Sequence, residues 1–431
     1  MRSFLRRQFV RHVGATLVRQ VIALAFALGH SAIVARWLGR EGKGALTLAL
    51  MLPGALGLFL SGGVGLANVY FAGSRRFPVS ILTANSVGFA ILASALSGVI
   101  VGVLAASGWL EKLMPGVPLW LALLAMVSLP LGLFSGYFTA ILQGLRRILA
   151  VNGVNLILGA LTLALTVALV VVFPLGLFGG LMASLVAGGV GLLLSGLLLR
   201  REGGIFRPRW DRSVMYPTLS FALRAHIGSV LQFFNYRLDV FVVNYFLGPA
   251  EVGIYSVSVG IAELLWYLPN AVGFVIFPKA AATKPEAMNL FTPRVFRITL
   301  GLTALGGVGL ALFAKPLIAF VYSSVFIGAY PPMLALLPGV VLLGSGKVLT
   351  NEIAGRGFPH YNSINAGVAL VLTVVLDVLL IPRYGIMGAA IASTISYSAI
   401  FVTAVIFYRL VSRRPTEQTA PSEGHMAQGN F

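Results

Sequence analysis

The sequence lacks cysteine and is poor in acidic residues, and both shortages limit what the protein can do. The absence of cysteine from its 431 residues excludes a disulfide framework, a thiolate metal site and a cysteine nucleophile. Asp and Glu together number 12, against 31 Lys and Arg, and charged residues make up 10% of the chain. A soluble protein of this length needs a more polar surface, so the missing charge indicates a membrane protein.

Long loops and a nucleotide-binding motif are also missing. Every stretch between apolar segments is short, so none can fold into a catalytic or regulatory domain. Membrane enzymes that act on lipid-linked sugars usually carry acidic catalytic residues beside a long loop, whereas the loops predicted on the outer side hold only Glu41, Glu111 and Glu251 as acids. No glycine-rich phosphate loop with a lysine is present, which excludes an ATP site of that kind. We therefore expect a transporter rather than an enzyme, driven by an ion gradient, by the membrane potential or by substrate flux.

Apolar residues make up 58% of the chain, and they fall into segments long enough to cross a bilayer as helices. In the first half these are residues 13–34, 45–69, 79–105, 119–142, 148–173 and 175–199, and in the second half residues 217–246, 252–277, 298–319, 333–349, 363–381 and 386–410. The pattern predicts an all-α integral membrane protein with 12 transmembrane helices. The net charge of +19 is not read as a nucleic-acid signal, because the basic residues flank apolar segments.

The basic residues gather in alternate loops, which sets the predicted orientation. One set of loops holds pairs such as Arg75–Arg76 and a run of arginines between Arg200 and Arg212. The opposite loops hold Arg36, Arg40, Lys43, Lys112 and Arg383. The positive-inside rule then places both termini in the cytoplasm.

The same pattern divides the chain. We predict an N-terminal six-helix bundle over residues 1–200 and a C-terminal six-helix bundle over residues 216–411, joined by a basic cytoplasmic linker at residues 201–215. Residues 412–431 are rich in Pro, Ser, Thr, Glu and Gln and are predicted to be a disordered cytoplasmic tail.

Two glycine patterns occur twice, each time 209 positions apart. LGREGKGALTL begins at Leu38 and LGPAEVGIYSV at Leu247, so that Gly44 matches Gly253. PLGLFGGLMAS and PRYGIMGAAIAS match in the same way, with Gly176 corresponding to Gly385. Two matches with one offset argue for a duplicated unit, and hence for two pseudo-symmetric bundles. In secondary transporters built this way the substrate site lies between the halves.

Ionisable residues inside the predicted spans are the candidate site residues, because a charge in the bilayer is costly unless it has a function or a partner. The first span holds Arg19 and His30 on one helical face. The seventh span carries a polar stripe, at steps of four, four, three and four, that cannot face lipid: Arg224, Gly228, Gln232, Asn235 and Asp239.

Cations outnumber acids within the spans, which suits an anionic substrate that guanidinium groups bind in bidentate fashion. We predict substrate binding by Arg19, Arg224 and Arg237, joined by His30, Gln232, Asn235 and Lys347. We predict coupling to H⁺ or Na⁺ through Asp239, Glu263 and Asp377, with no other cofactor and no metal. The open alternatives are structural: the acids neutralise the arginines, as in Arg237 with Asp239, Lys347 pairs with Asp377, and the histidines are hydrogen-bonded buried imidazoles.

Three segments carry a family resemblance: ARWLGREGKGALTLAL, RLDVFVVNYFLGPAEVGIYSVSVGI followed by FPKAAA, and PRYGIMGAAIAS. Together they resemble the multidrug/oligosaccharidyl-lipid/polysaccharide exporter superfamily, and within it the polysaccharide-transporter branch of Wzx-like flippases. The resemblance implies a V-shaped pair of bundles with a cavity lined by helices one, two, seven and eight. It also implies alternating access that carries an undecaprenyl-diphosphate-linked oligosaccharide across the bacterial inner membrane. The implied partners are the lipid-linked glycan, the bilayer and polysaccharide polymerase or assembly proteins; we expect a monomer and no nucleic acid.

Three other functions stay open. A multidrug exporter of the same superfamily usually holds cations with acidic cavity residues, whereas the first span here carries Arg19. A lipid II flippase typically has two further C-terminal helices. A non-transporting membrane scaffold has no need for buried polar stripes.

Overall fold

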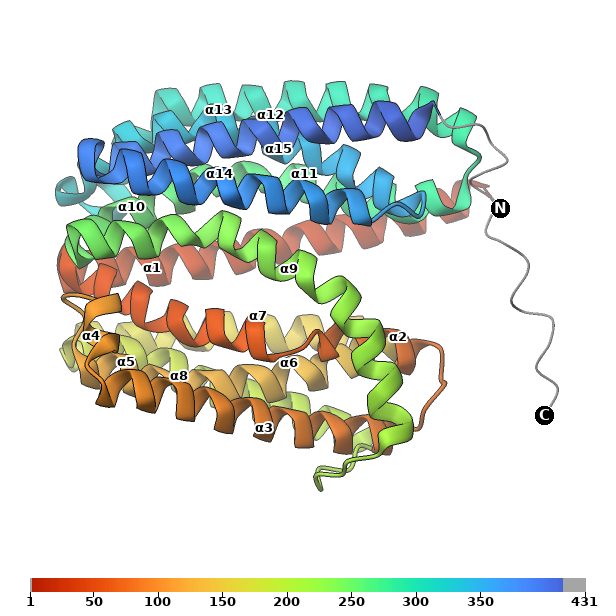
Figure 1. The fold of residues 1–431 in the computed structure, drawn as a ribbon, viewed down its shortest axis with the longest axis horizontal. Coiled ribbons are helices and arrows are strands. Elements are labelled where there is room, and N and C mark those ends of the chain that lie inside the picture. The colour runs from red at the N-terminus through yellow and green to blue at the C-terminus, as the bar shows by residue number, and fades with distance from the viewer. Residues whose placement is uncertain (1, 414–431) are drawn as a thin grey trace. The chain divides into compact units, whose positions relative to one another are not determined.

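The computed structural model describes residues 2–413, without the side chains of residues 2–20, 221, 224, 225, 278 and 282. Over that range the chain is all-helical, with no strand (Figure 1). Nine of the described helical segments are long and apolar enough to cross a membrane. The protein is therefore a multi-pass membrane protein, as the composition predicts.

The first half of the chain begins with two helices that meet at a kink at Gly39 and together carry the label α1, and shorter helices follow. Its elements are α1 (Arg2–Leu60), α2 (Val64–Gly73), α3 (Val79–Ala106), α4 (Trp109–Leu113), α5 (Leu119–Ala125), α6 (Ser128–Gly144), α7 (Ile148–Thr166), the π-helical turn η1 (Val167–Val172) and α8 (Gly176–Arg201). The helices of the second half are α9 (Arg212–Leu247), α10 (Pro249–Ala262), the 3₁₀ turn η2 (Glu263–Trp266), α11 (Tyr267–Ala282), α12 (Pro285–Tyr322), the 3₁₀ turn η3 (Ser324–Ala329), α13 (Tyr330–Gly355), α14 (His360–Tyr384) and α15 (Ile386–Ser412).

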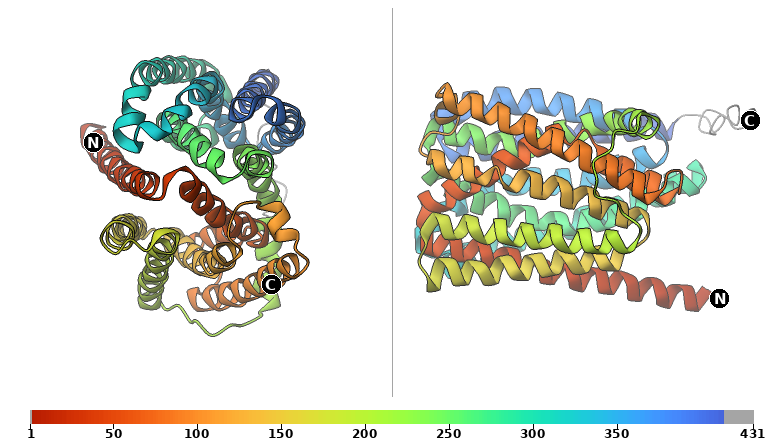
Figure 2. Two further views of the ribbon diagram at one scale, coloured as in Figure 1. Left: turned by 90° about the vertical axis from the view of Figure 1, so that its left-hand side faces the viewer. Right: turned by 90° about the horizontal axis from the view of Figure 1, so that it is seen from below.

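The chain packs into two compact units. Unit 1 holds the chain up to Val230 together with Leu247–Ile254 and Phe320–Phe326, and unit 2 holds Leu231–Phe246, Tyr255–Ala319 and the chain from Ile327 onward. Within unit 1, α3, α6, α7 and α8 run side by side (Figure 2). Within unit 2, α13 and α15 form the main contact, and α11 and α14 pack beside them.

The predicted break between the first two spans, at residues 35–44, lies at Gly39, but it is a single residue rather than a loop. Residues 35–44 are helical, and Gly39 alone turns the chain inside α1, with φ 69° and ψ −168°. A one-residue turn needs no loop, because glycine has no Cβ to clash in that conformation. Lys43, predicted in an outer loop, therefore lies in a helix, is 6% exposed and donates to Ser31 Oγ at 2.8 Å.

The eighth predicted span is continuous in sequence but not in helix type. Residues Glu263 to Trp266 form a 3₁₀ turn between α10 and α11. Pro269 contributes to this break, since its nitrogen cannot donate to the carbonyl of Leu265 four residues earlier.

The repeated glycines adopt repeated conformations. Gly39 and Gly248 have φ values of 69° and 83°, and Gly176 and Gly385 have φ values of 59° and 61°. All four lie in the left-handed region, which residues with a Cβ rarely occupy. Each pair is separated by 209 positions, so the same turn is used twice.

The linker between the halves ends in a helix cap. Asp211 Oδ1 accepts hydrogen bonds from the backbone N–H of Ser213 at 3.1 Å and from its hydroxyl at 2.6 Å. The hydroxyl bond is the main cause that lowers the pKa of Asp211, and the charge of Arg209 adds to it. An ionised aspartate at this position stabilises the first turn of α9.

Candidate functional site in unit 2

The charged residues of unit 2 form two adjoining groups. The first is built on a bidentate ion pair: Arg237 of α9 donates to Glu263 of η2 through Nη1 at 2.7 Å and Nη2 at 3.0 Å. The side chains are 33% and 21% exposed. The 3₁₀ turn thus places Glu263 beside α9, where its two oxygens match the two guanidinium nitrogens.

Lys347 of α13 belongs to the same group. Its ammonium donates to Asn270 Oδ1 at 3.1 Å and lies 4.0 Å from the centre of the Trp266 ring. The Trp266 indole is fixed in turn by its bond to the Val340 carbonyl at 3.0 Å. Lys347 is also within electrostatic reach of Glu263. We call Arg237, Glu263, Asn270 and Lys347 the charged patch; it contains two cations and one acid.

The second group is a pair of buried carboxylates. Asp239 of α9 is 2% exposed and accepts hydrogen bonds from Tyr255 Oη at 2.6 Å, from Ser393 Oγ at 3.2 Å and from the Val240 backbone at 2.8 Å. Asp377 of α14 is fully buried, and neither carboxylate oxygen has a hydrogen-bond partner among the described residues. The charge of Asp239 acts on Asp377. We call Asp239 and Asp377 the carboxylate pair.

Two neighbouring carboxylates in a low-dielectric interior repel each other and cannot both stay ionised without a positive charge beside them. Asp239 has hydrogen bonds that spread its charge, and the charge of Arg237 also acts on it, whereas Asp377 has no hydrogen-bond partner in the described structure. One bound proton or one small cation would therefore relieve the repulsion between the two carboxylates. Sodium in particular prefers the oxygen atoms that carboxylates and hydroxyls supply.

The structure brings together only some of the predicted site residues. Asn235 is 1% exposed and joins α9 to α14 by donating to the Ala366 carbonyl at 2.8 Å, so it has a structural bond. Gln232 is half-buried on α9, and its Nε2 makes no hydrogen bond within the described chain. His30 lies in unit 1, where its Nδ1 bonds Thr166 Oγ1 at 2.8 Å. The side chains of Arg19 and Arg224 lie outside the described residues.

The two structural pairs suggested by the sequence, Arg237 with Asp239 and Lys347 with Asp377, do not form a hydrogen bond or ion pair in the described structure. Arg237 is hydrogen-bonded to Glu263 rather than to Asp239, because the 3₁₀ turn brings Glu263 to it. Lys347 is bonded to Asn270 rather than to Asp377. Tyr255 and Ser393 were given no role, although Tyr255 follows Gly253 in one repeated motif and Ser393 ends the other. Each of the two residues lies in one of the repeated motifs, and that position was the signal that could have identified them as partners of the carboxylate pair.

Replacing Tyr255 with phenylalanine is expected to destabilise unit 2 by about 2 kcal/mol, because a buried hydroxyl bonded to a carboxylate is lost. Tyr330→Phe is the matched control: Tyr330 Oη donates to the neutral Ala311 carbonyl at 2.7 Å, and its loss should cost about half as much. Thermal unfolding of the purified variants compares the two. Equal shifts would contradict the special role of the Tyr255 bond.

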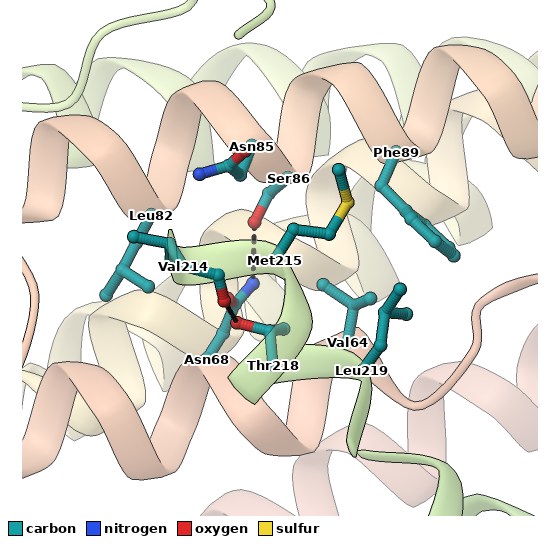
Figure 3. A pocket seen from close by; sticks show the side chains of 10 residues that line it. All are labelled: Val64, Asn68, Leu82, Asn85, Ser86, Phe89, Val214, Met215, Thr218 and Leu219. Atoms are coloured by element: carbon teal, nitrogen blue, oxygen red, sulfur yellow. Dashed lines mark hydrogen bonds between the residues drawn. The ribbon is translucent and has the colours of Figure 1, made fainter. Parts of the chain in front are cut away.

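A small cavity in unit 1 lies between the start of α9 and helices α2 and α3 (Figure 3). Asn68 Nδ2 donates to Ser86 Oγ at 2.8 Å beside it, and Thr218 donates to the Val214 carbonyl at 2.7 Å. With about 20 Å³ of free space it has room for a water molecule and not for a cargo.

Comparisons with known proteins agree with this architecture. A family model described as polysaccharide biosynthesis protein matches residues 33–331. The chain is 25% identical over 233 residues to a probable low-salt glycan biosynthesis flippase, Agl15, of Haloferax volcanii; the match covers 51% of this chain and 46% of that protein. The chain spans less than half the length of the curated relatives it matches.

Two solved structures share the fold over most of the chain. One is the lipid II flippase MurJ in an inward closed conformation, with a TM-score of 0.74, 15% identity, and coverage of 93% of this chain and 88% of that one. The other is an inward-facing multidrug resistance MATE family transporter, with a TM-score of 0.72, 17% identity, and coverage of 92% and 98%. At these identities the likeness concerns the fold.

Proposed function

Because this chain belongs to the polysaccharide biosynthesis protein family, we propose that it is a membrane flippase, without enzymatic activity, that moves a lipid-linked oligosaccharide across the cytoplasmic membrane. The family match confirms the resemblance that the repeated motifs carry. The all-helical fold, similar to exporters over more than nine-tenths of the chain, supports transport as the activity.

The charged patch is the observation that carries this proposal. Arg237 and Lys347 lie on helices of a membrane protein, yet the Arg237 side chain is 33% exposed and Lys347 is half-buried. Partly exposed charges at such positions do not face lipid, so they line a path that water or substrate enters. Two cations against one acid favour an anionic group, and the diphosphate of a lipid carrier has that chemistry.

We propose undecaprenyl diphosphate as the carrier and a bacterial inner membrane as the location, with both chain termini in the cytoplasm. Twelve crossings are consistent with the helices. Of the nine apolar segments, Val21–Leu60 is divided at Gly39 and His360–Ser412 at Gly385, and α9 adds one more. Further partners are then a glycan polymerase or assembly proteins.

Two other cargoes fit less well. A multidrug exporter needs acids that a drug-sized cation can reach, whereas Asp239 and Asp377 are 2% and 0% exposed. Lipid II shares the diphosphate chemistry of the proposed cargo. It differs in the attached sugar and peptide, so transport assays with the two lipids separate these readings.

We also propose that the carboxylate pair couples transport to a cation gradient. A proton or Na⁺ held between Asp239 and Asp377 neutralises the pair in one state, and its release restores the repulsion. Asp239 lies on α9 two residues after Arg237, so a shift of α9 moves a member of each group. The cation is therefore placed to alter the affinity of the charged patch for its anionic cargo.

A flipping assay tests the function directly. Proteoliposomes that contain the protein should move a fluorescent polyprenyl-diphosphate oligosaccharide between leaflets faster than empty vesicles, and depletion in cells should leave the lipid-linked glycan facing the cytoplasm. Unchanged glycan export after deletion, together with new drug sensitivity, would move the protein to the multidrug class.

Removing Arg237 tests the patch. Arg237→Ala is expected to lower the flipping rate at least tenfold, and Arg237→Lys to restore part of it, because lysine keeps the charge but not the fork. The double variant Arg237→Ala/Glu263→Ala separates binding from stability. If the pair were only structural, removing both charges would recover activity, since no buried charge is left unpaired. Substrate binding by Arg237 requires the double variant to stay inactive.

A further inference from the structure

A short motif, Gly-x-Arg-Arg, ends two helices of unit 1. Residues Gly73 to Arg76 end α2, and residues Gly144 to Arg147 end α6. In each, the first arginine adopts a left-handed conformation: Arg75 has φ 53° and Arg146 has φ 62°. Together with Ser323 they are the non-glycine residues with positive φ among those the structure describes.

Both turns are the same helix cap. The Arg76 and Arg147 backbones donate to carbonyls five residues earlier, at 3.3 and 2.9 Å, and Arg75 and Arg146 donate to carbonyls three residues earlier, at 3.3 and 2.9 Å. This pair of bonds normally ends on a left-handed glycine. The same chain uses glycine in the same cap elsewhere: Gly203 after α8 has φ 86° and Gly357 after α13 has φ 90°.

Arginine at the cap position is therefore a costly choice. A left-handed residue with a Cβ is strained, and glycine at this position would form the same hydrogen bonds without that strain. Side chains retained against backbone strain point to a function for the side chain. Here the property that arginine has and glycine lacks is its charged, phosphate-binding guanidinium group.

The two caps are held next to each other. A Cβ on Gly144 would lie 2.6 Å from the Val69 carbonyl oxygen and 3.1 Å from the Gly73 nitrogen, so the backbones of α2 and α6 touch at their last turns (Figure 1). This contact gathers four exposed arginines at one end of unit 1, which we call the Gly-x-Arg-Arg surface: Arg75, Arg76, Arg146 and Arg147.

Little in the described part of the chain neutralises this surface. Arg147 pairs with Glu202 at 2.8 Å. Arg76 lies over the rings of Phe71 and Phe77, 5.8 and 5.7 Å from their centres, which fixes its position without removing its charge. Arg75 and Arg146 have no ion pair among the described side chains. Three like charges at touching helix ends repel one another, so an external anion is favoured there.

We propose that the Gly-x-Arg-Arg surface binds the phosphate groups of anionic phospholipids in the bilayer. The surface lies where apolar helices end, which is the level of the lipid headgroups. All four arginines are exposed, so they suit headgroups at the membrane surface more than a single enclosed ligand. Guanidinium groups bind phosphate oxygens in bidentate fashion, and the attraction offsets both the strain and the repulsion.

Thermal unfolding in nanodiscs tests the proposal, because strain and lipid binding change the midpoint in opposite directions. In purely zwitterionic discs, Arg75→Gly/Arg146→Gly should unfold at a higher temperature than the wild type, since glycine relieves the left-handed strain. Adding phosphatidylglycerol should raise the wild-type midpoint, and the glycine variant should lose at least half of that rise. Arg75→Lys/Arg146→Lys keeps the charges and should keep most of it.

Two further variants complete the test. Arg294→Gln/Arg297→Gln removes two exposed charges from α12 on ordinary helical backbone and should keep the full rise with phosphatidylglycerol. Arg75→Asn/Arg146→Asn tolerates the left-handed conformation without charge and should behave as the glycine variant does. The proposal fails if the glycine variant keeps the full rise, or if the α12 control loses as much. It also fails if a polyprenyl diphosphate stabilises the protein while phosphatidylglycerol does not, since the surface would then serve the cargo.

Discussion

Replacing Gly44 with alanine is expected to prevent the protein from folding stably. A Cβ at this position would lie 1.7 Å from the carbonyl oxygen of Pro249 and 2.9 Å from the nitrogen of Gly253. Both are backbone atoms, so no side-chain rotation relieves the overlap, and the two segments of unit 1 must move apart. Overpacking of this kind costs about 4 kcal/mol or more, a large share of the stability of most proteins.

The equivalent change on the other side of the contact should have the same effect. A Cβ on Gly253 would lie 2.1 Å from the carbonyl oxygen of Arg40. Arg40 and Pro249 are themselves 209 positions apart, so each repeated motif presents a carbonyl to the glycine of the other. The contact is thus symmetric, and we expect Gly253→Ala to fail as Gly44→Ala does.

Gly98→Ala is the control for both. Gly98 lies within α3, and a Cβ there would have no neighbour within 4 Å. Alanine is the better helix former by about 1 kcal/mol, so this variant should be as stable as the wild type or more so. Size-exclusion profiles in detergent and thermal midpoints compare the three proteins. If Gly44→Ala matches Gly98→Ala in both its size-exclusion profile and its thermal midpoint, the close contact between the two glycine motifs is not needed for folding.

The repeat explains why much of this contact could be predicted and part could not. The offset of 209 identifies Gly44 and Gly253 as equivalent, and their shared motif marks them as special. That each lies against the carbonyl of the other motif depends on how the helices cross, and sequence periodicity carries no information about that. Composition and apolar length describe each segment by itself. They therefore predict the helical membrane class, but they do not predict which segments pack together.

The segment boundaries show a second limit. Loops were expected wherever charges interrupt an apolar run, yet a single glycine turns α1 and leaves Lys43 inside a helix. A prediction from hydropathy treats lysine as exposed. Here the ammonium is bonded to Ser31 and lies 5.8 Å from the centre of the Tyr322 ring, so its burial is compensated by residues far away in sequence.

The sequence identified most of the residues of the site, but not which of them are bonded to each other. The polar stripe on the seventh span identifies Asp239, and the cost of charge in a membrane identifies Arg237, Lys347 and Asp377. Their partners lie on other helices, so the bond between Glu263 and Arg237 could not be predicted from either helix alone. The bonds of Tyr255 and Ser393 to Asp239 join α10 and α15 to α9, and helical periodicity describes one helix at a time.

Replacing Asp377 with asparagine is expected to abolish cation coupling while leaving the fold intact. The variant removes one of two repelling buried carboxylates and keeps the shape of the side chain. We therefore expect a thermal midpoint equal to or above that of the wild type in the absence of coupling cation. The part of the flipping rate that depends on an imposed H⁺ or Na⁺ gradient should fall at least tenfold.

Glu352→Gln is the matched control. Glu352 is also fully buried in unit 2, but it is hydrogen-bonded to Arg356 and so already has a compensating charge. Neutralising it leaves the Arg356 guanidinium unpaired, which should destabilise the protein by about 3 kcal/mol without changing the dependence on the gradient. Asp377→Asn should therefore lose coupling and keep its stability, whereas Glu352→Gln should lose stability and keep its coupling.

The same proteins identify the cation. A ligand that binds the folded state stabilises it by RT ln(1 + [L]/Kd), so Na⁺ at 100 times its Kd should add about 2.7 kcal/mol to the wild type and nothing to Asp377→Asn. If a proton is the shared charge, Na⁺ has no specific effect, and the wild-type midpoint falls relative to the variant as the pH rises and the proton leaves. Asp239→Asn should lose the response to the cation as Asp377→Asn does, because one positive charge is held by both side chains. Gradient-driven flipping that survives in both variants would show that the carboxylate pair is structural and that coupling lies elsewhere in the chain.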